Sequence, residues 1–86
     1  MTQEIILYMR KNCHLCDDAK NILLELANDF AFKITEIDID CEDLLVEKYG
    51  LIIPVIMLNG EVIQYGQIVK ERLSKRLQEK NILKIG

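Results

Sequence analysis

The most constraining feature of this sequence is a pair of cysteines, Cys13 and Cys16, placed between an apolar run and a helical pattern. The run at residues 5–9 is typical of a buried strand, and apolar residues recur at helical spacing after the pair. This order places Cys13 at the first turn of a helix, where free N–H groups and the macrodipole favour a thiolate. Cys16 lies within about one turn on the same face, close enough to resolve a mixed disulfide. The spacing therefore predicts a redox pair.

Composition narrows the class of protein. The chain has 86 residues, 50% of them hydrophobic, and one proline, which is typical of one compact domain over residues 1–86. Its net charge is −3 and its longest basic run is Arg10-Lys11, so nucleic acid is not an expected partner. No apolar run approaches the roughly 20 residues of a membrane span, and no basic segment like that of a secretory signal precedes the first apolar stretch. We expect a cytoplasmic monomer that uses neither membrane nor nucleic acid.

The three cysteines are not expected to form a disulfide framework, because their number is odd and their spacing uneven. One redox pair and one spare thiol in a reducing compartment is the better interpretation. For the spare thiol, Cys41, we expect a small buried side chain, as for most free cysteines.

Hydrophobic periodicity and turn residues divide the chain into alternating strands and helices. Strands are expected at 4–9, 32–39, 54–58 and 61–65, helices at 13–28, 40–49 and from 66 onward, and a tail at 81–86 that either docks or frays. Asp40 is the expected N-cap of the second helix, and Gly50 the left-handed residue that ends it. The apolar stripe of the last helix is expected at Val69, Leu73 and Leu77.

This order of elements predicts the topology. A helix joins the first two strands, which should be parallel with a right-handed crossover, and Asn59-Gly60 should join the last two as an antiparallel hairpin. The result is an α/β chain of order βαβαββα, a four-stranded mixed sheet flanked by three helices, which is the thioredoxin fold. The strand at 4–9 is expected to be buried on both faces. In the strand at 32–39 the apolar side chains change from one face to the other at Thr35-Glu36, and the sequence offers no reason for this.

Three segments resemble known families. Residues 8–16, Tyr-Met-Arg-Lys-Asn-Cys-His-Leu-Cys, are similar to the active-site turn of glutaredoxins, and residues 49–55 and 58–62 resemble segments of thioredoxins. The whole chain most resembles the small bacterial glutaredoxin-like proteins of the thioredoxin superfamily. The resemblance implies a cis peptide bond between Ile53 and Pro54, beside the redox pair, with backbone groups that pair with an extended substrate. Without the resemblance, Pro54 is an ordinary strand-entry proline.

Two positions depart from these families. Glutaredoxins follow their fourth strand with an acidic pair that holds the charged end of glutathione, and this chain has Ile68 and Val69 there. Thioredoxins bury an acidic residue six positions before the first cysteine, where this chain has Leu7. We therefore expect weak use of glutathione.

These patterns predict a thiol–disulfide oxidoreductase in which Cys13 is the nucleophile and Cys16 the resolving thiol. No metal or organic cofactor is expected. The substrate would be a protein or small-molecule disulfide, and glutathione or a reductase would supply electrons. Arg10, Ile53 and Pro54 are the candidate substrate-binding residues, although Arg10 could equally be a solvated charge.

Two other functions stay open from the residues alone. Cys13 and Cys16 could hold zinc or an iron–sulfur cluster, although zinc usually takes four ligands. The chain could also be an interaction module that keeps the fold without redox turnover. His14 is either an imidazolium that stabilises the Cys13 thiolate or an exposed helix-start residue.

Overall fold

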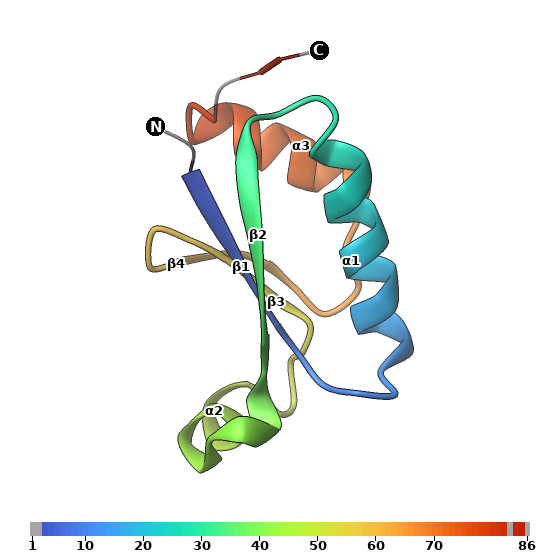
Figure 1. Ribbon diagram of the computed structural model, residues 1–86, viewed down its shortest axis with the longest axis vertical. Helices are drawn as coiled ribbons and strands as arrows, with labels where there is room; N and C mark the ends of the chain where they lie inside the picture. Colours follow the sequence, from blue (N-terminus) through green and yellow to red (C-terminus); the bar gives the residue numbers. More distant parts are fainter. Residues whose placement is uncertain (1–2, 83, 86) are drawn as a thin grey trace.

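The computed structural model describes residues 3–82 and 84–85, and its elements follow the predicted order (Figure 1). Their bounds are Gln3–Met9 for β1, His14–Leu26 for α1, Phe32–Asp38 for β2, Asp43–Tyr49 for α2, Val55–Leu58 for β3, Glu61–Tyr65 for β4 and Lys70–Glu79 for α3. A 3-10 turn, Ile39–Cys41, stands between β2 and α2. The predicted four-stranded α/β architecture with three helices is confirmed.

The sheet has the strand order β2-β1-β3-β4. β1 pairs with β2 in parallel and with β3 antiparallel, and β3 pairs with β4 antiparallel. Asn59 and Gly60, between β3 and β4, both have positive φ, 52° and 80°. Two such residues form the type I′ turn, whose twist matches that of the flanking strands. The predicted topology and hairpin are therefore confirmed.

Helices α1 and α3 cover one face of the sheet, and α2 covers one end of the other (Figure 1). Alternate residues of each central strand face the two sides. The first core lies under α1 and α3 and consists of Ile5, Leu7, Ala19, Leu23, Leu26, Phe30, Phe32, Ile56, Leu58, Ile63, Ile68, Leu73, Leu77 and Ile82. The second core lies under α2 and consists of Ile39, Tyr49 and Val55.

The second face of β1 is only half covered. Ile5 and Leu7 are fully buried in the first core, whereas Ile6 and Tyr8 on the opposite face are half-buried. Because α2 lies over one end of that face, the expected burial of this strand on both faces holds only in part.

The same layout explains the parity change in β2. Its first half packs on the first core through Phe32 and Ile34. Further along, Ile37 is paired in register with Tyr8, which packs on the second core, and the next residue of that parity, Ile39, is buried there. The apolar residues change sides because the helices cover different ends of the two faces.

The start of α2 differs from the prediction. Its N-cap is Glu42, which makes no side-chain capping bond, and not Asp40, which lies in the 3-10 turn. Asp38 caps that turn, since its Oδ1 accepts the Asp40 N–H at 2.9 Å. The end of α2 also differs, because Gly50 has φ −55° and is right-handed. A Cβ there would stand 2.5 Å from the Val46 carbonyl oxygen. Glycine is therefore needed because the Val46 carbonyl lies so close to it, and not because the backbone is left-handed.

The start of α3 is four residues later than predicted. Gly66 has φ 72° and belongs to the turn after β4, and Lys70 is the first residue of the helix. Leu73 and Leu77 are fully buried as predicted, but Val69 is the N-cap residue and is 40% exposed. The stripe is therefore shorter by one residue than the sequence pattern indicated.

The C-terminal tail docks on the first core. Ile82 is buried there, and an isolated antiparallel bridge joins Lys84 to Phe30. Leu83 and Gly86 lie outside the described residues. In the part of the chain that is described, no helix is long and apolar enough to span a bilayer.

Candidate active site

Cys13 is the N-cap residue of α1, with extended backbone angles of φ −110° and ψ 108°. Its Sγ accepts a hydrogen bond from the Cys16 N–H at 3.2 Å, which satisfies one of the free donors of the first turn. A disulfide joins Cys13 and Cys16, with their Cα atoms 5.2 Å apart. Cys13 is half-buried, whereas Cys16 is 2% exposed. Cys13 is therefore the more accessible residue of the pair, and its sulfur already has an N–H donor that favours the anionic form.

Three connections meet at the end of the sheet where β1 ends. Tyr8 is opposite Val55 in β3, and Met9 is opposite Asp38 in β2. The loop from β1 to the redox pair, the loop that precedes β3 and the turn that follows β2 therefore leave the sheet at the same end (Figure 1). The sheet register thus brings the predicted redox and proline segments to one end of the molecule.

The peptide bond between Ile53 and Pro54 is cis, as the resemblance implied. Hydrogen bonds hold this loop from both sides. The Gly66 N–H donates to the carbonyls of Pro54 at 2.8 Å and Ile52 at 3.1 Å, and the Ile53 N–H donates to the Tyr49 carbonyl at 3.1 Å. The end of α2 and the turn after β4 therefore fix the loop.

Tyr49 also supports the loop with its side chain, which the sequence gave no reason to single out. Its ring stacks on that of Tyr8 with centroids 4.6 Å apart and an interplanar angle of 26°. Ile52 and Ile53 pack against the second core, to which Tyr49 belongs. The residues before the cis bond thus pack on the core that contains this aromatic pair.

Arg10 is bound by a carboxylate of the chain itself. Its Nη2 lies 3.0 Å from Asp40 Oδ1, and its Nε lies 3.1 and 3.2 Å from Oδ1 and Oδ2. This ion pair ties the β1–α1 loop to the turn after β2. Sequence analysis missed Asp40 as a partner, because no local pattern links residues 30 positions apart.

The exposed residues beside the pair are of mixed charge. His14 is the first residue of α1 and is exposed, as are Lys11, Asp17 and Asp18. Leu15, between the two cysteines, is 40% exposed. The pair therefore faces solvent beside cationic, anionic and apolar side chains.

Cys41 is exposed, so its expected burial is wrong. The expectation treated Cys41 as part of a helix beginning at residue 40. Residues 39–41 instead form a 3-10 turn, in which Ile39 is the fully buried side chain.

A family model described as glutaredoxin-like domain (DUF836) matches residues 4–84. The chain belongs to this glutaredoxin-like family. A crystal structure of a protein from X. campestris has 30% sequence identity and a TM-score of 0.77, over 87% of this chain and 96% of that one.

Two more distant solved structures share the fold. A solution structure of a protein from Nitrosomonas europaea is 21% identical with a TM-score of 0.76, over 87% of this chain and 91% of that one. A malarial protein is 16% identical with a TM-score of 0.68, over 92% of this chain and 97% of that one.

In this glutaredoxin-like chain, apolar side chains stand at the two places where thioredoxins and glutaredoxins have acidic residues. Leu7 is fully buried, and the described residues include no buried charged or polar residue that could serve as a carboxylate beside Cys16. Ile68 is buried in the first core, and Val69 makes no capping bond at α3. The acidic residue in the first turn of α3 is Glu71, which is exposed.

The donor set around the pair does not resemble a metal centre. Within residues 3–82 and 84–85, no three His, Cys, Asp or Glu side chains are grouped so that they could hold an ion. A structural zinc site takes four such ligands. A zinc or cluster site at this pair would therefore need ligands from outside the described residues of this chain.

Proposed function

We propose that this chain is a thiol–disulfide oxidoreductase that cycles Cys13 and Cys16 between dithiol and disulfide. The observation that carries the proposal is the position of Cys13, which caps α1, accepts the Cys16 N–H at 3.2 Å and is more accessible than its partner. An accessible sulfur at a helix N-terminus is the environment of a nucleophilic thiolate, and a buried partner one turn away is placed to resolve it.

The reaction proceeds in two exchanges. The Cys13 thiolate attacks one sulfur of a substrate disulfide, so that a Cys13–substrate bond forms and the leaving thiolate takes up a proton. Cys16 then gives up its proton and attacks the Cys13 sulfur, which forms the internal disulfide and releases the second substrate thiol. Two electrons have passed to the substrate. Two thiols of glutathione or of a reductase then supply two electrons that reduce the Cys13–Cys16 disulfide again.

The proposed substrate is a disulfide in an extended protein segment. The Ile53 N–H is already bonded to Tyr49, so the carbonyl of Ile53 is the group proposed to pair with the substrate backbone. Leu51, just before this loop, is fully exposed, and Leu15 is partly exposed beside the cysteines. These apolar side chains suit a protein surface. Lys11, and not Arg10, is the proposed contact for an anionic substrate group, because Arg10 is paired with Asp40.

The test is turnover of a protein disulfide, with dithiothreitol as reductant, by three matched serine variants. Cys13→Ser should fall to the uncatalysed rate. Reduced Cys16→Ser, mixed with the substrate after the dithiothreitol is removed, should accumulate a covalent adduct that mass spectrometry detects. Cys41→Ser is the control and should stay within about threefold of the wild type, because Cys41 takes no part in the exchange. Turnover that survives Cys13→Ser would refute the assignment. A folded wild type without turnover would favour an interaction module.

Weak use of glutathione is part of the proposal. Charge-assisted hydrogen bonds are worth roughly 1.5–3 kcal/mol each, so an absent carboxylate should weaken glutathione affinity by about tenfold or more. The rate per active site in a glutathione-coupled mixed-disulfide assay should be lower than with the protein disulfide.

A gain of function at α3 sharpens this test. Val69→Asp should lower the glutathione concentration needed for half saturation, whereas Val69→Asn, which caps the helix equally well, should not. Saturation of the wild type at low glutathione would contradict the proposal.

A further inference from the structure

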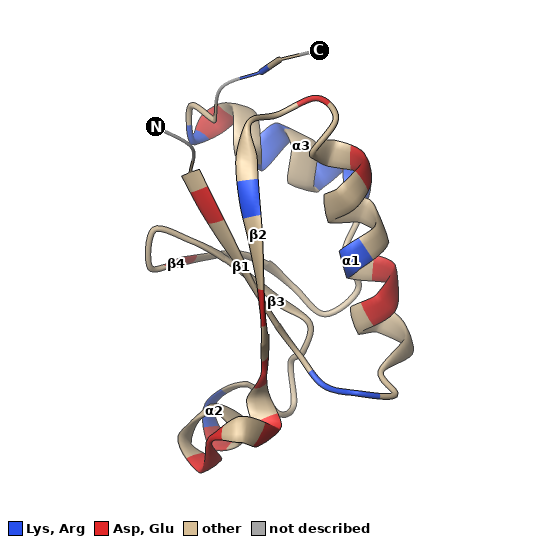
Figure 2. Ribbon diagram, viewed as in Figure 1, with Lys and Arg blue, Asp and Glu red and all other residues tan. Residues whose placement is uncertain are grey.

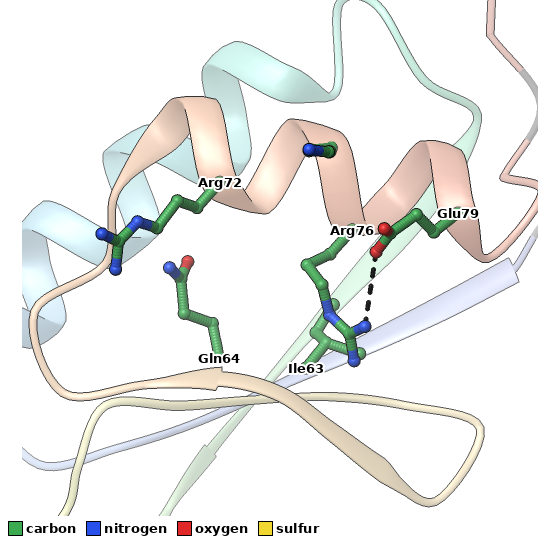
Figure 3. Close-up of a pocket in the computed structure, with 6 residues that line it drawn as sticks. Ile63, Gln64, Arg72, Arg76 and Glu79 are labelled. Atoms are coloured by element: carbon green, nitrogen blue, oxygen red, sulfur yellow. Dashed lines mark hydrogen bonds and ion pairs between the residues drawn. The ribbon is translucent and has the colours of Figure 1, made fainter.

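A groove lies between β4 and α3 (Figure 3). It consists of two adjoining pockets of about 330 and 310 Å³ that share Ile63, Gln64 and Arg72. Neither pocket is lined by the cysteines or by Pro54. Their volumes lie at the small end of the range for sites of small molecules. We call this surface the β4–α3 groove.

The β4–α3 groove is basic in an acidic protein. Residues 70–80 hold five basic and two acidic side chains, in a chain whose net charge is −3. Figure 2 shows this concentration of basic residues along α3. Arg72, Lys75 and Arg76 line the larger pocket together with one carboxylate, Glu79. The lining therefore carries an excess of positive charge.

Two of these cations form no ion pair with any residue that the structure describes. Arg76 lies 3.4 Å from both Glu61 and Glu79, so its charge is balanced. Among the residues that the structure describes, Arg72 and Lys75 form no ion pair. Both side chains line the larger pocket, so their charges are available to an anion there.

Gln64 adds a hydrogen-bond acceptor to the groove. Its Oε1 atom is buried and has no hydrogen-bond partner within the described part of the chain. In Figure 3 the side chains of Gln64 and Arg72 extend into the groove from opposite walls, one from β4 and the other from α3. A buried acceptor without a donor is unfavourable. The terminal torsion of a glutamine side chain is broad, so the amide can turn its oxygen toward the groove and accept an O–H or N–H group of a ligand there.

We propose that the β4–α3 groove binds a small phosphate ester that carries a hydroxyl group. A phosphate monoester has a charge of about −1.5 to −2 at pH 7, which matches the two available cations. Arg72 and Lys75 donate to the phosphate oxygens, and Gln64 Oε1 accepts from the hydroxyl. The site is independent of the proposed redox chemistry.

The test is a titration of ¹⁵N-labelled protein with ribose 5-phosphate and with methyl phosphate at constant ionic strength. Amide shifts should move in β4 and α3, and ribose 5-phosphate should bind more tightly because it supplies hydroxyl groups. Arg72→Gln should weaken both ligands by about tenfold, the loss of one charge-assisted hydrogen bond. Gln64→Met, which keeps the length of the side chain, should abolish the preference for the sugar phosphate.

Controls separate this site from surface charge and from the redox function. Lys33→Gln, an exposed lysine on the opposite edge strand, should leave both affinities unchanged. Cys13→Ser should bind as the wild type does, so failure of the redox proposal would not affect the result. The inference would be overturned by absent amide shifts at millimolar ligand, or by equal losses of affinity in Arg72→Gln and Lys33→Gln.

Sedimentation with phosphatidylglycerol vesicles tests a lipid surface as the source of the phosphate. Vesicle binding that is lost in Arg72→Gln, without a response to ribose 5-phosphate, would overturn the small-molecule assignment.

Discussion

The two faces of the sheet differ in how much they bury and in what they support. The first core joins α1 and α3 to all four strands, whereas the second core has three buried residues, Ile39, Tyr49 and Val55. The loop before the cis bond packs on the second core. We infer that the first face supplies most of the stability and that the second positions the loop before Pro54. Changes on the two faces should therefore have separable effects on unfolding and on turnover.

The largest expected effect is on the first face. Leu23→Ala removes a fully buried side chain and should lower the free energy of unfolding by about 2–5 kcal/mol, as measured by urea denaturation. Leu45→Ala, at a half-buried position of α2, should cost clearly less, because less area leaves water there. Leu24→Ala, at a 50% exposed position of α1, is the control and should change little. Equal losses in Leu23→Ala and Leu45→Ala would remove the distinction between the faces.

The next effect separates stability from function on the second face. Tyr8→Leu and Tyr49→Leu, combined in a double-mutant cycle, should show a coupling of about 0.5–1.5 kcal/mol, the usual worth of an aromatic pair. Turnover should fall in Tyr49→Leu even where the protein remains folded, because Tyr49 supports the loop before Pro54. A cycle without coupling, together with unchanged turnover, would show that the stack does not position the loop.

Local patterns predicted the parts of this molecule that depend on local chemistry. The spacing of Cys13 and Cys16 and the Asn59-Gly60 turn act over a few residues, and both were located correctly from the sequence. The cis bond at Pro54 came from the resemblance, because most X–Pro bonds are trans.

The features that the sequence did not reveal depend on contacts between distant segments. The pairing of Arg10 with Asp40 spans 30 positions. Cys41 is exposed because residues 39–41 form a 3-10 turn, in which Ile39 and not Cys41 is the buried side chain. The parity change in β2 reflects which end of the sheet α2 covers. The buried Oε1 of Gln64, which has no partner among the described residues, could not be predicted without the packing of β4 and α3.

A smaller effect compares two ion pairs, one between the loops at the end of the sheet and one between β2 and α1 on the first face. Asp40→Asn should lower the free energy of unfolding by at most about 1 kcal/mol, because both partners are partly exposed. Glu36→Gln breaks the single 3.3 Å contact between β2 and Lys20 of α1 and should cost less, since Arg10 makes several contacts with its partner. Both losses should shrink in high salt. A larger loss in Glu36→Gln would contradict the structure at the β1–α1 loop.

The smallest effect is a pH dependence at the rim of the first face. The hydrogen bond and charge of Lys80, with a further contribution from Arg76, lower the pKa of Glu61. A lowered folded-state pKa stabilises the fold above the ordinary pKa of the group, and this contribution is lost as pH falls through the folded value. The difference in urea midpoint between wild type and Glu61→Gln should therefore be constant near neutral pH and shrink from about pH 5 downward. A difference that grows on acidification would have the wrong sign.

The most direct test of the redox assignment is a titration of the wild-type protein in glutathione redox buffers, followed by acid quenching, alkylation and mass mapping of the cysteines. The account predicts one two-electron transition in which Cys13 and Cys16 convert together from dithiol to disulfide, while Cys41 does not join that disulfide. A pair that stays unchanged across the whole range of buffers, or a disulfide that includes Cys41, would contradict it.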